Sequence, residues 1–445
     1  MEQRTDEGTH ERGESLSVVG REVPATSVRS FLGAVEGPSV AWSTSDATMV
    51  GGGTALALTA AGADRFDAIR RAATDVFERL DGPTDVPPAA RPRLFGGFAF
   101  HEDHDRPEAG PWRGYPGGRF VLPAIQLTST ADGTWLTAAE TGPSATAAAD
   151  ARLDAWTDRL GALPTVAEAA PPGIEAREPT PDRAGWRSQV RAALDGIDRG
   201  DLRKVVLAQS LAVDLERELS VPDALARLGA TYPDCARFLV EPPGAGTFFG
   251  ATPEELVTLE DRSVRTTVLA GSTGRGDTAE EDAWLADELR DSAKDVHEHE
   301  VVLEAVRDQL APMAAAVDAG DRDVRQLATV QHLETPVQAR LDRDRHVLEL
   351  VEALHPTPAV GGMPQDAALE TIRQHEAFER GWYAAPVGWI DAAGNGRFAV
   401  AIRSAVARDR RATLFAGAGI VADSDPEREW GELQLKYRPV LDELE

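Results

Sequence analysis

The feature that most limits the possible folds is the order of strand-like and helix-like segments after residue 181. A helical face over 182–199 leads into an apolar strand at 204–213, and four more short strands are expected between 237 and 268, before the long helical pattern of 282–310. Strands that occur in clusters, with helices between the clusters and no repeating βαβ unit, are typical of an α+β fold. We therefore predict an α+β fold rather than a doubly wound parallel sheet.

The remaining segments divide the chain into three parts. Residues 1–24 are polar and predict a flexible tail, residues 25–181 form the N-terminal part of the fold, and residues 182–445 carry the sharpest patterning. The first long part ends at 163–181, where Pro, Ala and Glu without a period predict a linker-like loop. Further strands are expected at 94–100, 120–127, 134–138, 324–333, 335–341, 386–390, 398–403 and 412–416, and further helices at 64–80, 145–160 and 425–441.

The charge balance excludes several classes of function. The 445 residues carry a net charge of −28, whereas binding to nucleic acid or to an anionic membrane requires a basic face. No apolar stretch is long enough for a membrane helix, and the N-terminus lacks the basic start and apolar core of a signal peptide, so we expect a cytoplasmic protein. The single cysteine, Cys235, excludes an internal disulfide and a cysteine-based metal site.

Lysine is almost absent from the chain. Of 46 Lys plus Arg residues, only Lys204, Lys294 and Lys436 are lysines. Many acidic residues with so few lysines are typical of adaptation to high salt, because dense carboxylates keep a protein hydrated. GC-rich coding, which favours arginine, is the alternative. Since arginine cannot replace lysine where an amine must lose its proton, the three lysines are candidates for lysine-specific chemistry, against the alternative of chance survival.

Two pairs of acidic residues have the spacing of a helix face. Asp295 and Glu298 lie three residues apart in one expected helix, and Glu429 and Glu432 do so in another. If the two helices meet, the four carboxylates need a cation between them, and oxygen ligands suit Mg²⁺. The alternative for each pair is a solvated helix face. Two histidines flank the first pair as possible further ligands, His297 and His299.

Two residues could act as base and acid. Lys204 opens an apolar strand, and a lysine in a partly desolvated cleft can serve as a base. Glu254 and Glu255 follow a strand and a tight turn, Gly250-Ala251-Thr252-Pro253, where a partly buried glutamate could serve as a general acid. The alternatives are a strand-end lysine that reaches water and an ordinary turn.

A glycine-containing segment could approach an anion. Gly417 and Gly419 leave room for backbone N–H groups near a ligand, although the spacing is not that of a dinucleotide-binding loop. Arg403 ends the preceding strand and could bind a carboxylate through two hydrogen bonds, with a surface salt bridge as the alternative.

Taken together and in this order, these segments resemble the chorismate-binding family of isochorismate, anthranilate, aminodeoxychorismate and salicylate synthases. The resemblance runs from about residue 182 to the C-terminus. It implies a large α+β unit in which two antiparallel sheets pack face to face, with helices outside and the active site in a cleft. The matching motifs are Gly200-Asp201-Leu202-Arg203-Lys204-Val205-Val206-Leu207, Gly250 to Glu254, Leu269-Ala270-Gly271-Ser272, Ser292 to His299, His355-Pro356-Thr357-Pro358-Ala359, Phe415 to Ile420 and Glu429-Trp430-Gly431-Glu432.

Two alanines indicate the branch of the family. Relatives that form aminodeoxychorismate can carry a nucleophilic lysine where this chain has Ala270, so the resemblance implies water as the nucleophile. Relatives that form salicylate tend to have threonine where Ala359 stands, and the stretch 355–364 resembles isochorismate synthases. The expected activity is the isomerisation of chorismate to isochorismate, without a glutaminase subunit, for menaquinone or a siderophore. Menaquinone is preferred because a respiratory quinone is the more general need.

The resemblance also implies a role for each site residue. Lys204 would activate water for attack at C2, and Glu254 would protonate the departing C4 hydroxyl. Glu298 and Glu432 would hold Mg²⁺, supported by Asp295 and Glu429. The substrate would be bound by Ala270, Gly271, Ser272, His332, Ala359, Arg403, Gly417, Gly419 and Lys436.

Three points stay open on the sequence. Gln209 stands where the family often has arginine, so a supporting salt bridge could be missing. A salicylate or amine-using synthase and a non-catalytic chorismate-binding protein are the alternatives to an isochorismate synthase. The chain is expected to be a monomer or a homodimer.

Overall fold

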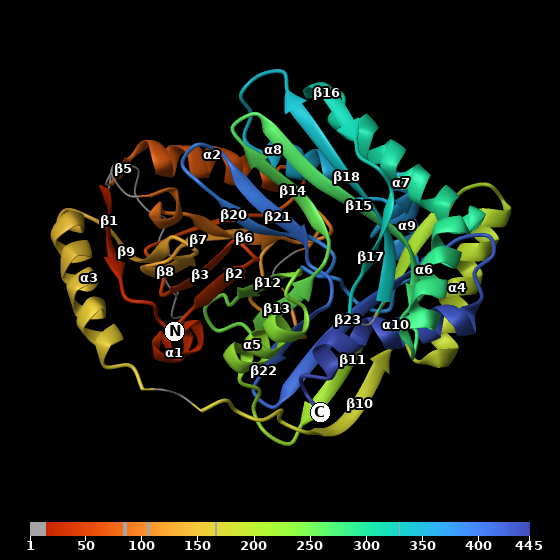
Figure 1. Cartoon of the computed structure of the whole chain (residues 1–445), viewed down its shortest axis with the longest axis horizontal. Coiled ribbons are helices and arrows are strands. Elements are labelled where there is room, and N and C mark those ends of the chain that lie inside the picture. The colour runs from red at the N-terminus through yellow and green to blue at the C-terminus, as the bar shows by residue number, and fades with distance from the viewer. Residues whose placement is uncertain (1–14, 83–86, 105–106, 165–166, 329) are drawn as a thin grey trace, which may run out of the picture.

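The computed structural model describes residues 15–82, 87–104, 107–164, 167–328 and 330–445. Within them the chain forms two large sheets surrounded by helices, which confirms the α+β prediction (Figure 1). No helix of this part of the chain has the length and apolar character needed to cross a bilayer.

The larger sheet is antiparallel except for one short parallel pair, β1 with β5. Its strands lie in the order β10 (Ile174–Thr180), β11 (Lys204–Leu215), β23 (Arg411–Ile420), β22 (Ser404–Arg408), β13 (Thr247–Thr252), β12 (Ala236–Val240), β2 (Ser39–Ser43), β3 (Ala47–Gly52), β8 (Ile125–Thr130), β9 (Gly133–Thr141), β1 (Leu16–Val23) and β5 (Leu80–Asp81), with β19 (Gly362–Met363) beside β11.

The smaller sheet is antiparallel throughout its described strands. Its order is β16 (Ala314–Ala319), β18 (Val330–Leu341), β15 (Ser263–Gly274), β14 (Glu255–Glu260), β21 (Gly396–Val400), β20 (Pro386–Ile390), β6 (Leu94–Phe98), β7 (Gly118–Leu122) and β4 (Leu56–Ala60), with β17 (Asp323–Gln326) beside β18.

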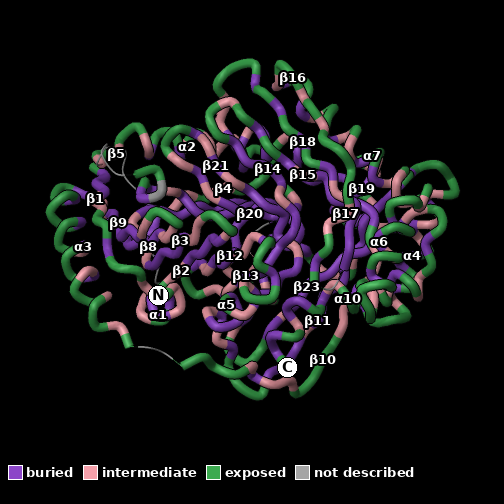
Figure 2. Tube along the Cα trace, viewed as in Figure 1, coloured by how far each residue is buried: buried purple, intermediate pink, exposed green. Residues whose placement is uncertain are grey.

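The helices lie on the outside of the two sheets, and the buried residues concentrate between them (Figures 1 and 2). One continuous apolar cluster draws residues from both sheets and from the helices. The helices are α1 (Val28–Ala34), α2 (Arg65–Glu78), α3 (Ala145–Gly161), α4 (Arg183–Asp198), α5 (Val221–Thr231), α6 (Ala279–Asp291), α7 (Ala293–Leu310), α8 (Val347–Leu354), α9 (Gln365–His375) and α10 (Pro426–Leu441), and a short 3₁₀ turn covers Pro88–Ala90.

In both sheets, strands that precede Pro181 in the chain pair with strands that follow it. In the larger sheet β2 pairs with β12, and in the smaller sheet β6 pairs with β20. A glycine permits the second pairing, because a Cβ on Gly97 would stand 2.6 Å from the carbonyl oxygen of Pro386 in β20. The N-terminal and C-terminal parts of the chain therefore complete each other's sheets.

Several local predictions are wrong. Residues 16–23 of the expected tail form β1, and residues 174–180 of the expected linker form β10; residues 1–14 lie outside the described residues. The single strand expected at 120–127 is two strands in different sheets, β7 and β8, separated at Pro123, which lacks a backbone N–H for pairing. The strand expected at 335–341 continues β18, and α5 was not predicted.

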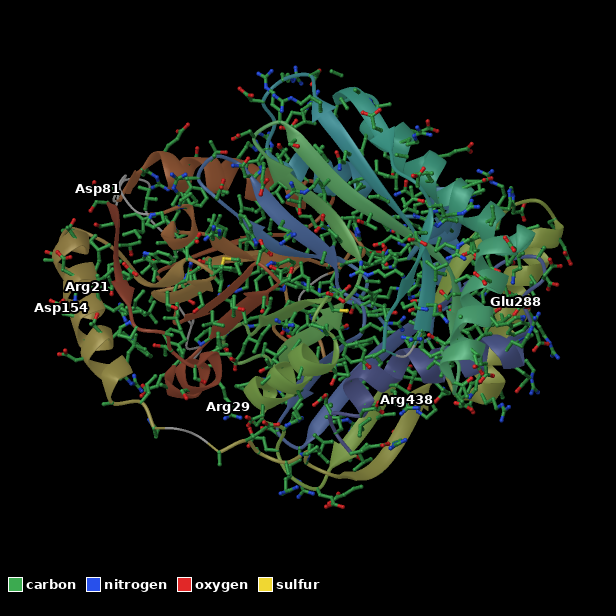
Figure 3. The ribbon with its side chains drawn as sticks, in the orientation of Figure 1. Arg21, Arg29, Asp81, Asp154, Glu288 and Arg438 are labelled. Carbon is green, nitrogen blue, oxygen red and sulfur yellow. The ribbon has the colours of Figure 1, made fainter. Side chains whose placement is uncertain are left out.

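The surface carries many paired charges. On the left edge of the molecule Arg21 of β1 lies beside Asp154 of α3, with 2.8 Å between Nη2 and Oδ1 (Figure 3). Both side chains are about half exposed, and such pairs contribute about 0–1 kcal/mol each. The charged surface therefore contributes more to the hydration of the protein than to its folding stability.

Candidate active site

A cavity opens where β11, β15 and β23 meet α7 and α10, with an empty volume of about 1100 Å³ including its mouth. Every residue predicted to be catalytic, to bind substrate or to hold a metal lines this one cavity. Residues from all seven motifs, spread from position 204 to position 432, are brought together here.

Lys204 is the first residue of β11 and is 6% exposed. Its Nζ donates a hydrogen bond of 2.6 Å to Oε1 of Glu298, so the strand end holds an amine inside the cavity rather than in solvent. On one side of the strand end, Lys204 pairs with Met363 of β19. The next residue, Val205, pairs with Ile420 of β23.

The two glycines of β23 make room for the lysines. A Cβ on Gly419 would lie 3.1 Å from Cε of Lys204, and one on Gly417 would lie 3.2 Å from the hydroxyl of Tyr383. The carbonyl oxygen of Gly417 accepts a hydrogen bond of 2.7 Å from Nζ of Lys436. Side chains at these two positions would displace the groups that line the cavity.

Glu254 lies in the short connection between β13 and β14 and is 8% exposed. Its carbonyl oxygen accepts from the N–H of Val400, and its own N–H donates to Oγ1 of Thr252, so the backbone is fixed on both sides. Burial raises the pKa of the Glu254 carboxyl to about 7, although the positive charge of Lys204 opposes the rise. A carboxyl with this pKa is a usable proton donor at neutral pH.

The four predicted metal ligands come from the first two turns of two helices. The hydroxyl of Ser292 caps α7 by accepting from the N–H of Asp295, and Asp425 caps α10 by accepting from the N–H groups of Glu427 and Arg428. These caps start each helix so that its pair of acids faces the cavity: Asp295 with Glu298, and Glu429 with Glu432.

Three of these acids have shifted pKa values, and the shifts differ in direction. Burial, and secondly the negative charge of Glu432, raise the pKa of Glu429 to about 6. Burial also acts to raise the pKa values of Glu298 and Glu432, but Lys204 and Lys436 respectively outweigh it, and both pKa values are lowered. Among the described residues no three Asp, Glu, His or Cys side chains are already arranged to hold a metal ion.

The opposite wall comes from a bulge in β15. The pairing of β15 with β18 shifts between Ala270 and Ser272, where Gly271 has a φ of +78°. Ser272 then stands opposite His332, with 2.8 Å between Oγ and Nδ1. Burial lowers the pKa of His332 to about 3, so the imidazole is neutral and offers a neutral hydrogen-bonding group to the cavity.

Arg403 places a cation in the cavity. It is a buried non-glycine residue with a φ of +52°, a conformation that costs of the order of 1 kcal/mol or more and often occurs at functional sites. In the part of the chain that the structure describes, no acidic side chain forms an ion pair with Arg403. Burial lowers the pKa of its guanidinium. A buried cation without a protein counter-ion is suited to an anionic ligand.

Comparison with known proteins decides the family. Residues 4–445, nearly the whole chain, match the family described as chorismate binding enzyme. The chain belongs to this chorismate-binding family. The resemblance noted from its motifs is thereby confirmed.

Relatives of this chorismate-binding protein are similar over most of their length. The salicylate biosynthesis isochorismate synthase of Pseudomonas aeruginosa is 36% identical over 417 residues, which cover 92% of this chain and 85% of the relative. Isochorismate synthase MenF of Bacillus subtilis is also 36% identical, over 80% of this chain and 75% of the relative. The solved structure of the menaquinone-specific isochorismate synthase MenF of Escherichia coli has the same fold, with a TM-score of 0.82 at 24% identity, covering 97% and 95% of the two chains.

Two histidines considered as ligands do not belong to the cavity lining of this chorismate-binding protein. His299 is 1% exposed and points from α7 into the smaller sheet, where Nδ1 lies 3.2 Å from the Ala270 carbonyl oxygen and Nε2 lies 2.7 Å from Oγ1 of Thr335. His297 does not line the cavity either. Only Glu298, between them, faces it.

Gln209 has partners of its own. Its Nε2 donates to the carbonyl oxygen of Pro181 at 2.8 Å, and the Tyr437 hydroxyl lies 3.3 Å from Oε1 of Gln209 and 2.9 Å from its backbone carbonyl oxygen. The buried amide is thus satisfied without a salt bridge at this position.

Three polar residues that line the cavity were not predicted as site residues. Lys294 adjoins Asp295 and was singled out only because lysine is rare. Tyr383 lies in the apolar run Gly381-Trp382-Tyr383-Ala384, where a lone hydroxyl was the available signal. Arg380 gave no signal, because its backbone partners Val360 and Val206 lie 20 and 174 residues away in the sequence.

Proposed function

We propose that the protein is an isochorismate synthase, an isomerase that converts chorismate to isochorismate. The observation that carries the proposal is that Lys204, at the start of β11, and Glu254, in the connection between β13 and β14, enter one cavity, with Ala270 where amine-using relatives can carry a nucleophilic lysine. The names of the similar proteins support this choice of reaction over its siblings.

The chemistry needs a base and an acid that act on different atoms. Lys204 accepts a proton from the water that attacks C2 of the ring, and Glu254 gives its proton to the hydroxyl that leaves C4 as water. One water is consumed and one is released, so substrate and product are isomers. The pKa of about 7 keeps much of the Glu254 population protonated near neutral pH, as this role requires.

The substrate's two carboxylates need cationic partners. Arg403 supplies a guanidinium without an acidic partner in the described chain, and it can bind a carboxylate through two hydrogen bonds. Lys436 already donates to the Gly417 carbonyl oxygen and lies beside Glu432, so it bridges the glycine segment and the acidic pair. Ser272, His332 and Ala359 bound the remaining wall around the ring.

We propose Mg²⁺ as the cofactor, held by Glu298 and Glu432 with Asp295 and Glu429 in support. The donor set fits, because it consists only of carboxylate oxygens and because Mg²⁺ usually takes one or two carboxylates together with water and substrate oxygens. Burial, and secondly the negative charge of Glu432, raise the pKa of Glu429, and a bound cation would offset the second effect. When bound, the ion would neutralise and orient a substrate carboxylate.

The test is incubation of the purified protein with chorismate and Mg²⁺ in concentrated potassium chloride without ammonia, with products identified by chromatography and mass. Isochorismate that disappears with EDTA or with Lys204→Ala is the expected result. Arg227→Met is the control variant and is expected to keep activity, because Arg227 does not line the cavity. Salicylate with pyruvate, or a product that requires ammonia, would assign a sibling reaction. If the folded protein turns over no chorismate, either without or with ammonia, the alternative of a non-catalytic chorismate-binding protein is favoured.

For the cellular setting we propose a salt-rich cytoplasm, on the basis of the net charge of −28 and the near-absence of lysine. We propose that the enzyme works as a monomer or homodimer without a glutaminase subunit. Menaquinone is the proposed destination of the product, and loss of menaquinone in a deletion strain that exogenous isochorismate restores is the corresponding test.

A further inference from the structure

The strand that begins with Lys204 is incompletely paired on one side. β23 accompanies β11 from Val205 to Asp214, but on the other side β19 pairs only with residues 204–205 and β10 only from residue 210 onward. Residues 206–209 therefore meet no described strand on that side. The carbonyl oxygen of Val206 accepts from Nη2 of Arg380 at 2.7 Å, and the N–H of Ala208 donates to Oε1 of Glu376 at 2.8 Å.

An ion pair at the end of α9 thus occupies the gap. Nε of Arg380 donates to Oε2 of Glu376 at 2.9 Å, and the two side chains are 1% and 3% exposed. The guanidinium also lies over the ring of Phe100, 4.3 Å from its centroid. Since Nε and both terminal nitrogens of Arg380 have protein partners, Arg380 is a positioning residue rather than a substrate ligand.

The same guanidinium also reaches the 355–361 loop, whose Gly361 carbonyl oxygen accepts a hydrogen bond of 2.9 Å from the N–H of Val206 in β11. Nη1 of Arg380 donates to the carbonyl oxygen of Val360 at 2.8 Å, next to Ala359, which lines the cavity. This loop turns on itself through the N–H of Gly361, which donates to the carbonyl oxygen of Thr357. Oγ1 of Thr357 lies 3.5 Å from Oε1 of Glu254. Arg380 therefore adds two side-chain hydrogen bonds to the direct backbone bond between Val206 and Gly361, and so ties the strand of the proposed base to the loop that touches the proposed acid.

We propose that the Glu376–Arg380 pair is a positioning unit for the reaction, which fixes the separation between the Lys204 strand and the 355–361 loop. The inference rests on the proposed function. Without the pair, Lys204 and Glu254 stay in the cavity but lose their mutual alignment. Displacement of reacting groups by about 1 Å can lower a rate about 10²-fold.

The experiment compares three variants of the full chain. Glu376→Gln is expected to lower kcat by about 10²-fold, with KM for chorismate within a few-fold of the wild type, because Arg403 and Lys436 are untouched. Arg380→Lys keeps the charge but cannot reach both carbonyl oxygens, so an intermediate kcat is expected. Arg227→Met, which removes a partly buried ion pair with Glu443 outside the cavity, is the control and should lower thermal stability without lowering kcat.

Wild-type kcat in a folded Glu376→Gln protein would overturn the proposal, as would an equal loss of kcat in Arg227→Met at a matched unfolding temperature. If neither single variant folds, the double variant Arg380→Met/Glu376→Leu, which leaves no unpaired buried charge, takes its place under the same criteria. Amide hydrogen exchange separates this inference from the proposed function. Faster exchange over both 204–209 and 355–363 in Glu376→Gln is expected even if wild-type protein makes no isochorismate, and unchanged exchange in either segment would refute the positioning role.

Discussion

Replacing Glu254 by glutamine should stabilise the protein at high pH while removing activity. The folded protein holds this carboxyl at a pKa of about 7, against an ordinary value of 4.5, because the side chain is buried. Between these two pH values the folded state keeps a proton that the unfolded chain has lost, so the wild type loses stability as the pH rises through this window. Moving a carboxyl pKa from 4.5 to about 7 corresponds to about 3 kcal/mol.

The difference in unfolding free energy between Glu254→Gln and wild type should therefore depend on pH in a defined way. It changes by about 3 kcal/mol in favour of the variant between pH 4.5 and pH 7 and levels off above the folded pKa. Denaturant titrations at fixed salt, with EDTA and without substrate, measure it, because a bound ligand would shift stability by itself.

Asp282 supplies a control, because its pKa is shifted in the opposite direction to that of Glu254. The hydrogen bond from Arg275 lowers the pKa of Asp282 from 3.8 to about 2, so the difference between Asp282→Asn and wild type should be flat above about pH 5, where the carboxyl is ionised in both states. A difference for Glu254→Gln that stays constant from pH 5 to pH 8 would refute the reasoning, since Glu254 would then be ionised in the folded protein and could not serve as the proton donor.

The remaining predictions concern the same cavity. Lys204→Ala should lower kcat by about 10²–10⁴-fold in the chorismate assay, and near-normal turnover would remove it as the base. Gly419→Ala should leave the unfolding midpoint nearly unchanged but lower activity, because its Cβ would lie 3.1 Å from Cε at the flexible end of Lys204 and would displace the amine. Full activity would show that the Lys204 side chain can accommodate the methyl group without losing its function. Arg403→Lys should raise KM roughly ten- to a hundred-fold with a smaller effect on kcat, as expected for loss of a charged hydrogen bond, whereas an unchanged KM would assign the substrate carboxylate elsewhere. kcat/KM should fall as the pH rises above about 7, where Glu254 loses its proton, and a rate that rises through this range would contradict its role.

Local sequence patterns predict the parts of the site that depend on neighbours in the chain. The spacing of Asp295 and Glu298 places both on one face of α7, and the same holds for Glu429 and Glu432 on α10. Whether the two helices meet does not follow from the spacing. The resemblance to a known family supplied that information.

Features that depend on distant partners could not be predicted from local patterns. The segment 174–180 has the composition of a linker, and it becomes β10 only because β11 offers an edge beside it. Arg380 sits in a short connection after α9, and its importance appears only when Val206, 174 residues away, accepts its hydrogen bond. The break at Pro123 was visible in the sequence, but the assignment of β7 and β8 to different sheets was not.

All side-chain amines of the protein line one cavity, because Lys204, Lys294 and Lys436 are the only lysines in the chain. An acylating or alkylating reagent that is selective for lysine side chains would therefore label this cavity specifically. Protection of the lysines by substrate would then serve as a binding assay. The same holds for spontaneous carbamylation or glycation. Such damage to lysine side chains would strike this cavity alone, so the enzyme would lose activity while its acidic surface, and with it its solubility in salt, stayed intact.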